Sequence, residues 1–146
     1  MNKVNLEKIK ESASLFRLAL EQCHADLSIS FSEFPSGSCG DTSELLGAFL
    51  NDNGLGKFDY VCAEFGNMSD NNWGTHAWLE QGDLVIDITA DQFDFISEKI
   101  IVCNNSYWHK SLDETIRHLA DYRVNAINLG SEYKKITKEI NELRTK

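Results

Sequence analysis

The stretch THAWLEQGDLVIDI, residues 75–88, decides the fold that this chain is expected to adopt. Two runs of strand-forming residues, 75–80 and 84–88, flank the short polar connection QGD. A short connection with a central glycine between such runs is typical of a β-hairpin. Two further strands are expected, at residues 58–65 before this hairpin and at 99–103 after it. The middle of the chain therefore predicts a β-sheet.

Helices are expected on both sides of these strands. Apolar residues spaced three and four apart predict one face of an amphipathic helix near the N-terminus. These residues are Leu6, Ile9, Ala13, Phe16, Leu20 and Cys23. A second helix is expected over residues 41–51, with Asn53-Gly54 at its end. Residues 27–34, between the two, alternate loosely and fit either a short strand or an extended approach to the next loop.

The C-terminal part of the chain is expected to return to helix. Ser111 and Glu114 have the spacing of a capping box at a helix start, and a last charged helix is expected from about Ser131. This order favours the α+β class, with N-terminal helices packed on an antiparallel sheet and C-terminal helices after it. With 146 residues and no visible linker, the chain is expected to form a single domain, residues 1–146.

Charge and composition disfavour several classes of partner. The chain carries 23 acidic and 14 basic residues, a formal net charge of −9, and a negative surface does not attract nucleic acid or an anionic membrane. No apolar run has the roughly 20 residues that span a bilayer, and residues 1–8 lack the apolar stretch of a signal peptide. The four cysteines are widely spaced without a C-x-x-C pair, which favours free thiols and a cytoplasmic protein.

A cysteine, a histidine and an aspartate follow one another in an order that suits nucleophilic catalysis. Cys39 lies in GSCGDTS, residues 37–43, where a loop is expected to become a helix. The N–H groups and dipole of a helix start favour a thiolate, and an imidazole such as His76 can take up the thiol proton and return it. Asp87 follows His76 by 87 − 76 = 11 residues. The hairpin is expected to place both side chains on one face, where the carboxylate could orient the imidazole.

These residues resemble the transglutaminase-like branch of the papain-like cysteine enzymes. The matching pieces are GSCG at residues 37–40, HAW at 76–78 and DIT at 87–89. The resemblance covers residues 34–93, less than half of the chain. It implies a papain-like or transglutaminase-like core in which Cys39 is the nucleophile, His76 the general base and acid, and Asp87 the orienting carboxylate.

The sequence departs from this family at two places near Cys39. Gly40 follows the cysteine where the family often has a tryptophan, and no glutamine lies between Gln22 and Cys39 to act as an oxyanion donor. That donor is then missing, or it is supplied by Ser36, Ser38 or the backbone. The chain is also small for a crosslinking transglutaminase, so the resemblance supports acyl chemistry better than it supports crosslinking.

Further residues are assigned around these three. Ser38 and Gly40 flank the cysteine and are expected to contact substrate. Trp73 and Trp78 are expected to wall a cleft, although aromatic residues near a strand start are more often part of a core. Asp91 is a rival candidate for the carboxylate role.

The other cysteines and histidines are expected to have structural roles and not catalytic ones. The cysteines fall in apolar patterns, which favours packing, and the histidines have no companion motif, which favours surface or helix-face positions. These residues are Cys23, Cys62, Cys103, His24, His109 and His118. Zinc could accept the cysteine, histidine and aspartate described above, but they lack the close pairing common in zinc sites. Neither a metal nor another cofactor is expected.

Two functions follow from these patterns. The first is a cysteine enzyme that acts on an amide of a protein or peptide substrate through an acyl-enzyme, with hydrolysis or deamidation favoured over acyl transfer. The second is a binding or regulatory module that keeps the fold but has no turnover. Reactivity of the cysteine toward an alkylating reagent distinguishes them.

Overall fold

A five-stranded antiparallel sheet, with strand order β4-β3-β2-β1-β5, organises the computed structural model, which describes residues 3–145. Along the chain the helices and strands are α1 (Lys3–Cys23), α2 (Cys39–Asp52), β1 (Asp59–Phe65), β2 (Gly74–Gln81), β3 (Leu84–Asp87), β4 (Ile101–Asn104), α3 (Tyr107–Lys110), β5 (Asp113–Leu119) and α4 (Gly130–Arg144). The predicted α+β class and the antiparallel pairing are confirmed.

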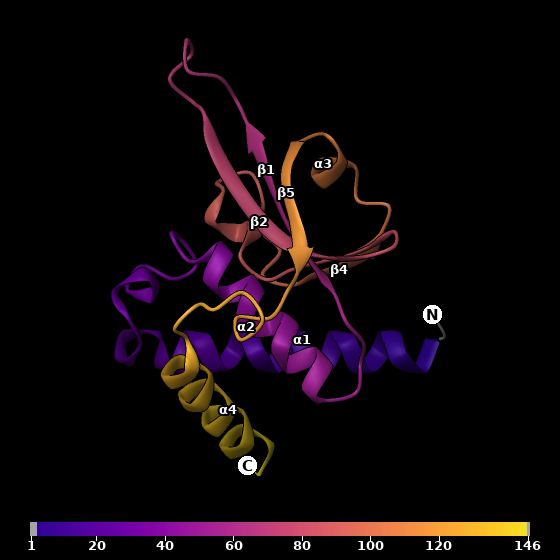
Figure 1. The fold of residues 1–146 in the computed structure, drawn as a ribbon, viewed down its shortest axis with the longest axis vertical. Helices are drawn as coiled ribbons and strands as arrows, with labels where there is room; N and C mark the ends of the chain where they lie inside the picture. The colour runs from indigo at the N-terminus through magenta and orange to yellow at the C-terminus, as the bar shows by residue number, and fades with distance from the viewer. Residues whose placement is uncertain (1–2, 146) are drawn as a thin grey trace.

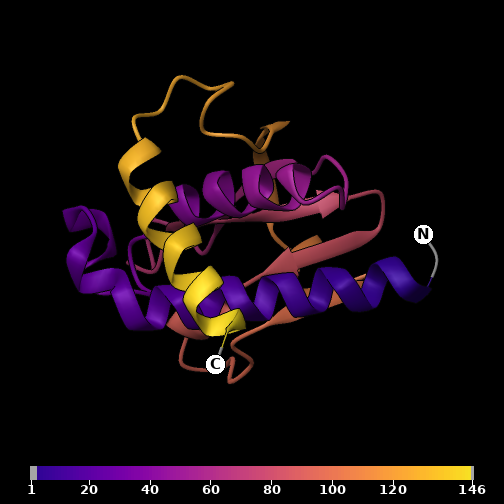
Figure 2. The same cartoon turned by 90° about the horizontal axis from the view of Figure 1, so that it is seen from below.

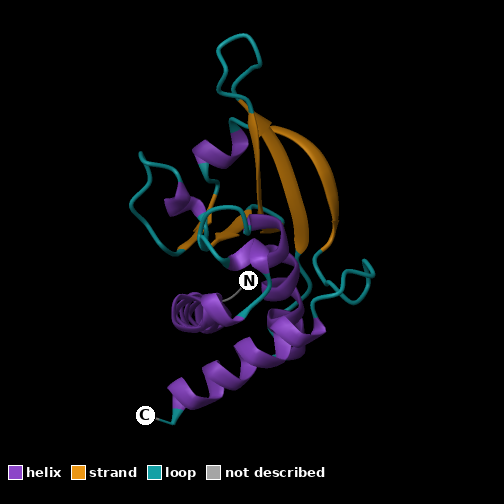
Figure 3. Cartoon of the chain, turned by 90° about the vertical axis from the view of Figure 1, so that its left-hand side faces the viewer, coloured by secondary structure: helices purple, strands orange, loops and turns teal. Residues whose placement is uncertain are grey.

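The three long helices gather on one side of the sheet, and α3 lies beside β5 (Figure 1). Helix α2 packs on β1 and β2, while α1 packs against α2 and α4. Figure 2 shows α4 crossing α1, and Figure 3 shows the strands as a separate layer from these helices. The main core lies between the helices and the sheet, and its fully buried members include Phe16, Leu20, Leu45, Leu50 and Ile136.

A second, smaller core covers the opposite face of the sheet. It consists of Val61, Ala63, Trp78 and Val85, with Leu112 packed against it. Because side chains alternate along a strand, the residue two positions before Trp78 on β2 lies on this same face. That residue is His76. Its imidazole therefore lies on the face of the smaller core, opposite the face that α2 covers.

The segment that begins at Ser111 is not a helix, so the capping-box prediction is wrong. Ser111 instead ends α3, because its N–H donates to the carbonyl of Tyr107 (3.0 Å) and its hydroxyl donates to the carbonyl of Trp108 (2.6 Å). Glu114 lies in β5, where it is paired with Ala63 of β1. Pairing with a distant strand has overridden a local helix signal here.

Residues 27–34 form neither a strand nor an extended segment. They fold into short 3₁₀ turns, one of them at Ile29–Phe31. The N–H of Phe31 donates to the carbonyl of Ser28 (3.0 Å), and the N–H of Phe34 donates to the carbonyl of Phe31 (3.1 Å). The ring of Phe31 is completely buried in the main core. Tight turns that bury this ring have replaced the expected extended chain.

Within residues 3–145, no helix is both long enough and apolar enough to cross a membrane. The four cysteines are free thiols.

Candidate active site

Helix α2 begins at Cys39, whose side chain is half-buried. The first bond of the helix runs from the N–H of Thr42 to the carbonyl of Ser38 (2.8 Å), so the N–H groups of the first turn have no acceptor within the helix. Ser38 is the N-cap residue and is buried, but its side chain does not cap these N–H groups. The start of α2 therefore offers free donors next to the thiol, as expected for a site that holds an anion.

Gly40, the next residue, lies against Tyr60 of β1. A Cβ at Gly40 would stand 3.2 Å from the Tyr60 hydroxyl, which is tighter than an ordinary van der Waals contact. The glycine therefore lets the start of α2 approach β1 closely. A bulky residue, such as the tryptophan common in the resembled family, would not fit at this position without moving Tyr60.

The hairpin of β2 and β3 brings His76 and Asp87 together. Leu79 is paired with Ile86 and Gln81 with Leu84, and this register puts Asp87 diagonally across from His76 on the same face. Nε2 of His76 lies 2.7 Å from Oδ2 of Asp87. Both side chains are almost completely buried, at 0% and 2% exposed.

Cys39 approaches His76 beside the part of β2 that has no partner in β3. Strand β3 pairs with β2 only from Leu79 to Gln81, whereas β1 pairs with β2 along its whole length. The backbone N–H of Ala77 and the side chain of His76 both lie close enough to the Cys39 thiol to lower its pKa. Since Nε2 of His76 is taken by Asp87, the nitrogen that can exchange a proton with Cys39 is Nδ1.

The three side chains shift one another's pKa values. Burial alone would raise the pKa of Cys39, but the hydrogen bond and charge of His76, with the Ala77 N–H, bring the pKa below its ordinary value. Burial alone would lower the pKa of His76, but the Asp87 carboxylate outweighs it and raises the pKa to about 9. Burial would likewise raise the pKa of Asp87, yet His76 and His109 hold it well below its usual range. These directions favour a thiolate–imidazolium pair at neutral pH.

Four hydrogen bonds hold the Asp87 carboxylate. Besides His76, His109 contacts Oδ2 through Nε2 at 2.8 Å. Oδ1 accepts from the N–H of Thr89 (3.0 Å) and from the Thr89 hydroxyl (3.4 Å). The threonine of the DIT motif thus orients the carboxylate two residues before it.

His109 is a site residue that sequence reasoning missed. It was expected at a surface or on a helix face, but it is only 3% exposed. Its single local signal is Ser106, three residues earlier, which is the N-cap of α3. That spacing is common at helix starts and does not indicate contact with Asp87.

Gln92 is a second residue that the sequence did not reveal. Its amide nitrogen lies 3.2 Å from Nδ1 of His76, the nitrogen that faces Cys39. Amide nitrogen and oxygen can be exchanged by rotation, so this side chain can donate to a neutral imidazole or accept from a protonated one. Gln92 contacts the imidazole, and this is a different position from the oxyanion donor that papain relatives carry upstream of the cysteine.

Asp91, the rival carboxylate, is engaged elsewhere. Its two oxygens lie 2.6 and 2.8 Å from the guanidinium of Arg17 in α1. Arg17 also donates to the carbonyl of Ile88 (2.8 Å) and lies over the ring of Phe34. This buried arginine fixes the segment that follows β3, which carries Gln92, and leaves Asp87 as the carboxylate at the imidazole.

Aromatic rings pack around His76. The ring of Phe93 meets the imidazole edge-on at 5.1 Å between centroids, and that of Trp108 lies at 5.6 Å. Phe95 contacts both rings and is 71% exposed. Such rings exclude water from the imidazole and strengthen its interaction with Asp87.

The two tryptophans assigned to a cleft differ in position. Trp78 is buried in the smaller core, where it stacks on His76 at 5.7 Å and its Nε1 donates to Glu80 (2.8 Å). It is a wall of the imidazole pocket, closed to solvent. Trp73 lies one residue before β2 and is 48% exposed.

Three of these side chains could also hold a metal ion. The ligand atoms of His76, Asp87 and His109 all lie within 4.8 Å of one another. The zinc interpretation that the sequence disfavours has Cys39 in place of His109. Both Nε2 atoms, however, already lie at hydrogen-bond distance from one carboxylate oxygen. To bind here, a metal ion would have to replace the Nε2 hydrogens of both histidines at a fully buried position. The observed distances therefore fit a hydrogen-bond network better than a metal site.

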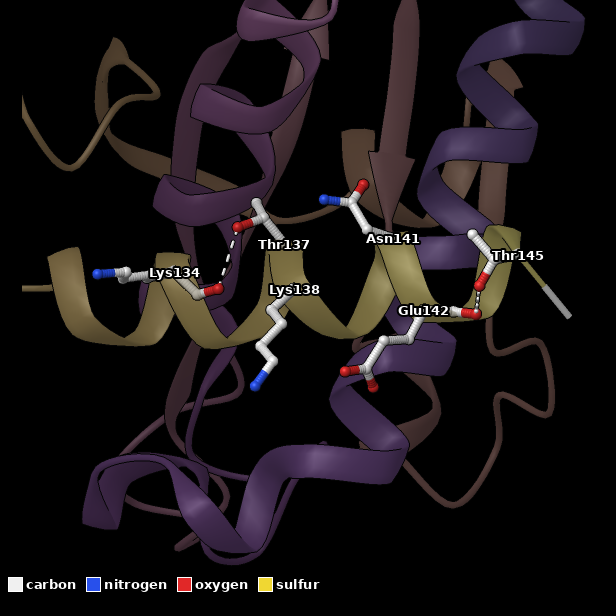
Figure 4. Close-up of a pocket in the computed structure, with 6 residues that line it drawn as sticks. All are labelled: Lys134, Thr137, Lys138, Asn141, Glu142 and Thr145. Atoms are coloured by element: carbon white, nitrogen blue, oxygen red, sulfur yellow. Dashed lines mark hydrogen bonds between the residues drawn. The ribbon is translucent and has the colours of Figure 1, made fainter.

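A surface hollow on α4 contains none of these residues. Figure 4 shows that it is lined by one helix, with Lys134, Thr137, Lys138, Asn141, Glu142 and Thr145. Its side chains are those of a solvated helix face, and we assign it no part in the site.

Comparison of the chain with family models, with curated proteins and with solved structures finds no match.

Proposed function

We propose that this chain is a cysteine enzyme with a transglutaminase-like core that acts on an amide of a protein or peptide through a thioester, by hydrolysis or deamidation. One observation carries the proposal. The Cys39 thiol at the start of α2 lies close enough to His76 for the imidazole to lower its pKa, and Nε2 of His76 lies 2.7 Å from the buried carboxylate of Asp87.

In the first half-reaction, the Cys39 thiolate attacks the carbonyl carbon of the amide. The oxygen becomes negative, and the free N–H groups of the first turn of α2 are placed to donate to it. The C–N bond then breaks, and the proton on Nδ1 of His76 passes to the leaving nitrogen. The product is a thioester on Cys39 together with a free amine, or ammonia if the amide is a glutamine side chain.

In the second half-reaction, His76 acts as the base. Nδ1, now without its proton, takes one from a water molecule as the water oxygen attacks the thioester carbonyl. The C–S bond breaks, which releases a carboxylic acid and restores the Cys39 thiolate and the protonated imidazole. Asp87 keeps its charge throughout and stabilises the imidazolium each time it forms.

The electrostatics favour an enzyme over a binding module. A buried histidine–carboxylate pair loses the hydration of both groups and contributes little net stability on that account. Strongly shifted pKa values that converge on a cysteine are typical of a functional site. A module without turnover needs neither the shifts nor the free donors at Cys39.

Alkylation by iodoacetamide tests the proposal within one molecule. Cys103 is half-exposed like Cys39 and serves as the internal control, with peptide mapping to assign each adduct. Cys39 is expected to react at least tenfold faster than Cys103 at pH 6.5, and His76→Gln is expected to remove that advantage. If Cys39 reacts no faster than Cys103, the activated nucleophile is excluded and the binding module remains.

Electrophiles that mimic an amide then identify the reaction. Peptide aldehydes and vinyl sulfones should add to Cys39, as seen by intact mass, and Cys39→Ala should abolish the adduct. With glutamine-containing peptides as substrates, release of ammonia identifies deamidation, and cleavage of the chain identifies peptide hydrolysis.

A further inference from the structure

The Asp87 carboxylate is shared between two histidines. Oδ2 lies 2.7 Å from Nε2 of His76 and 2.8 Å from Nε2 of His109. His76 comes from β2 and His109 from α3, so the carboxylate on β3 joins two parts of the fold. The proposed catalytic steps use only His76, which leaves the buried His109 without a role.

Asp87 and Ser106 together favour the tautomer of His109 that carries its hydrogen on Nε2. Oγ of Ser106 lies 2.6 Å from Nδ1 of His109 and also accepts from the backbone N–H of that residue. A hydroxyl that accepts from an N–H keeps its own hydrogen free to donate, here to Nδ1. An ionised carboxylate can only accept, so the hydrogen of His109 lies on Nε2 and points at Asp87. The rings of Trp78 and Trp108, each at 4.7 Å between centroids, pack against the imidazole and hold its plane.

Two N–H donors on one carboxylate oxygen compete for its charge. Each hydrogen bond withdraws electron density from Oδ2 and weakens the attraction that Oδ2 exerts on the other donor. His109 thereby acts on His76 without touching it. The strength of that attraction matters, because an imidazolium held too tightly by its carboxylate is a poor proton donor to a leaving nitrogen.

We propose that His109 is a positioning residue that shares the Asp87 carboxylate with His76 and so limits how firmly Asp87 holds the proton of His76. The catalytic consequence rests on the proposed function; the effect on His76 does not. The ionisable groups that face His76 are Cys39 from α2 and Asp87 from β3, and His109 from α3 faces the shared carboxylate. Of these, only His109 can be replaced without removing a member of the catalytic set.

The test is the titration of His76, monitored by NMR of its imidazole signals, in three variants and in the unmodified protein. His109→Phe removes the donor and keeps a ring, and it is expected to raise the midpoint of His76 by roughly half to one pKa unit, a three- to tenfold gain in proton affinity. His109→Gln retains an N–H donor of similar reach and should restore the midpoint of the unmodified protein. His118→Phe is the matched control, since His118 contacts Glu44 and Tyr60 but not Asp87, and it should change nothing.

A midpoint that stays the same or falls in His109→Phe would overturn the proposal. Should that variant fail to fold, Ser106→Ala provides the second arm, because it keeps His109 but removes the hydrogen bond at Nδ1 that helps to hold its ring and tautomer. The midpoint of His76 is then expected to rise by a smaller amount, and a fall would again refute the role. The titration of His76 requires no turnover, so it can be interpreted even if the alkylation test fails. Likewise, the alkylation test can be interpreted even if His109 does not affect the titration of His76.

Discussion

Replacement of Asp87 by asparagine should uncouple the imidazole from the thiol. The pKa of His76 is about 9 against an ordinary value of 6.5, a difference of 9 − 6.5 = 2.5 units. At about 1.4 kcal/mol per unit, this corresponds to about 3 kcal/mol of preference for the charged imidazole. Burial remains in the variant and lowers the pKa, so His76 should titrate at or below 6.5. At pH 7.5 its protonated fraction then falls from nearly all to about a tenth.

The assay combines NMR titration of His76 with the alkylation rate of Cys39 between pH 5 and 10. In Asp87→Asn, we expect the rate at pH 6.5 to fall at least tenfold, because the thiolate loses its cationic partner. Asp94→Asn removes one exposed charge elsewhere and serves as the control. A midpoint of His76 that stays near 9 in Asp87→Asn would show that Asp87 is not the source of the shift, and the account of the site would be wrong.

The same pair makes stability depend on pH. The folded-state pKa of His76 lies above its ordinary value, so the stabilisation is complete below pH 6.5 and is lost as pH rises through about 9. In a Cys39→Ala background, which removes the thiol titration together with the contribution of Cys39 to the pKa of His76, the free energy of urea unfolding should fall by less than about 3 kcal/mol between pH 6.5 and 10. Adding Asp87→Asn should flatten this decline, and an equally steep decline in the double variant would contradict the linkage.

Two further predictions concern the frame around the site. Arg17→Met leaves the carboxylate of Asp91 without its partner and should lower the free energy of unfolding by about 3 kcal/mol. Arg117→Met removes a more exposed guanidinium that pairs with Asp59, Glu80 and Glu114 and should cost only about 1 kcal/mol; equal losses would contradict the role of burial. Gly47→Ala places a Cβ against the backbone that follows β5 and should cost about 2 kcal/mol, whereas Gly130→Ala meets open space and should stay within about 0.5 kcal/mol. Chemical denaturation measures all four, and a tolerated Gly47→Ala would show that α2 can shift relative to the sheet.

Patterns that depend on nearby residues predicted the elements well. The apolar spacing of residues 6–23 predicts α1, because a helix repeats every 3.6 residues and its buried face is visible in the sequence. The strands of the hairpin were predicted to within one or two residues. The helix expected from Ser111 failed because a capping box is a local signal, whereas β5 exists by pairing with β1, some 50 residues earlier in the chain.

The sequence by itself determined Cys39, His76 and Asp87 as a group, since one helix start and one hairpin suffice to relate them, and these are local structures. Only the tertiary structure decided what surrounds them. His109 contacts Asp87 across 22 residues, Gln92 contacts His76 across 16, and Arg17 contacts Asp91 across 74. These contacts depend on where α1, α3 and the turn after β3 pack against the sheet. The packing of these elements depends on the burial of whole helix and sheet faces. A pattern of a few neighbouring residues in the sequence therefore does not predict it.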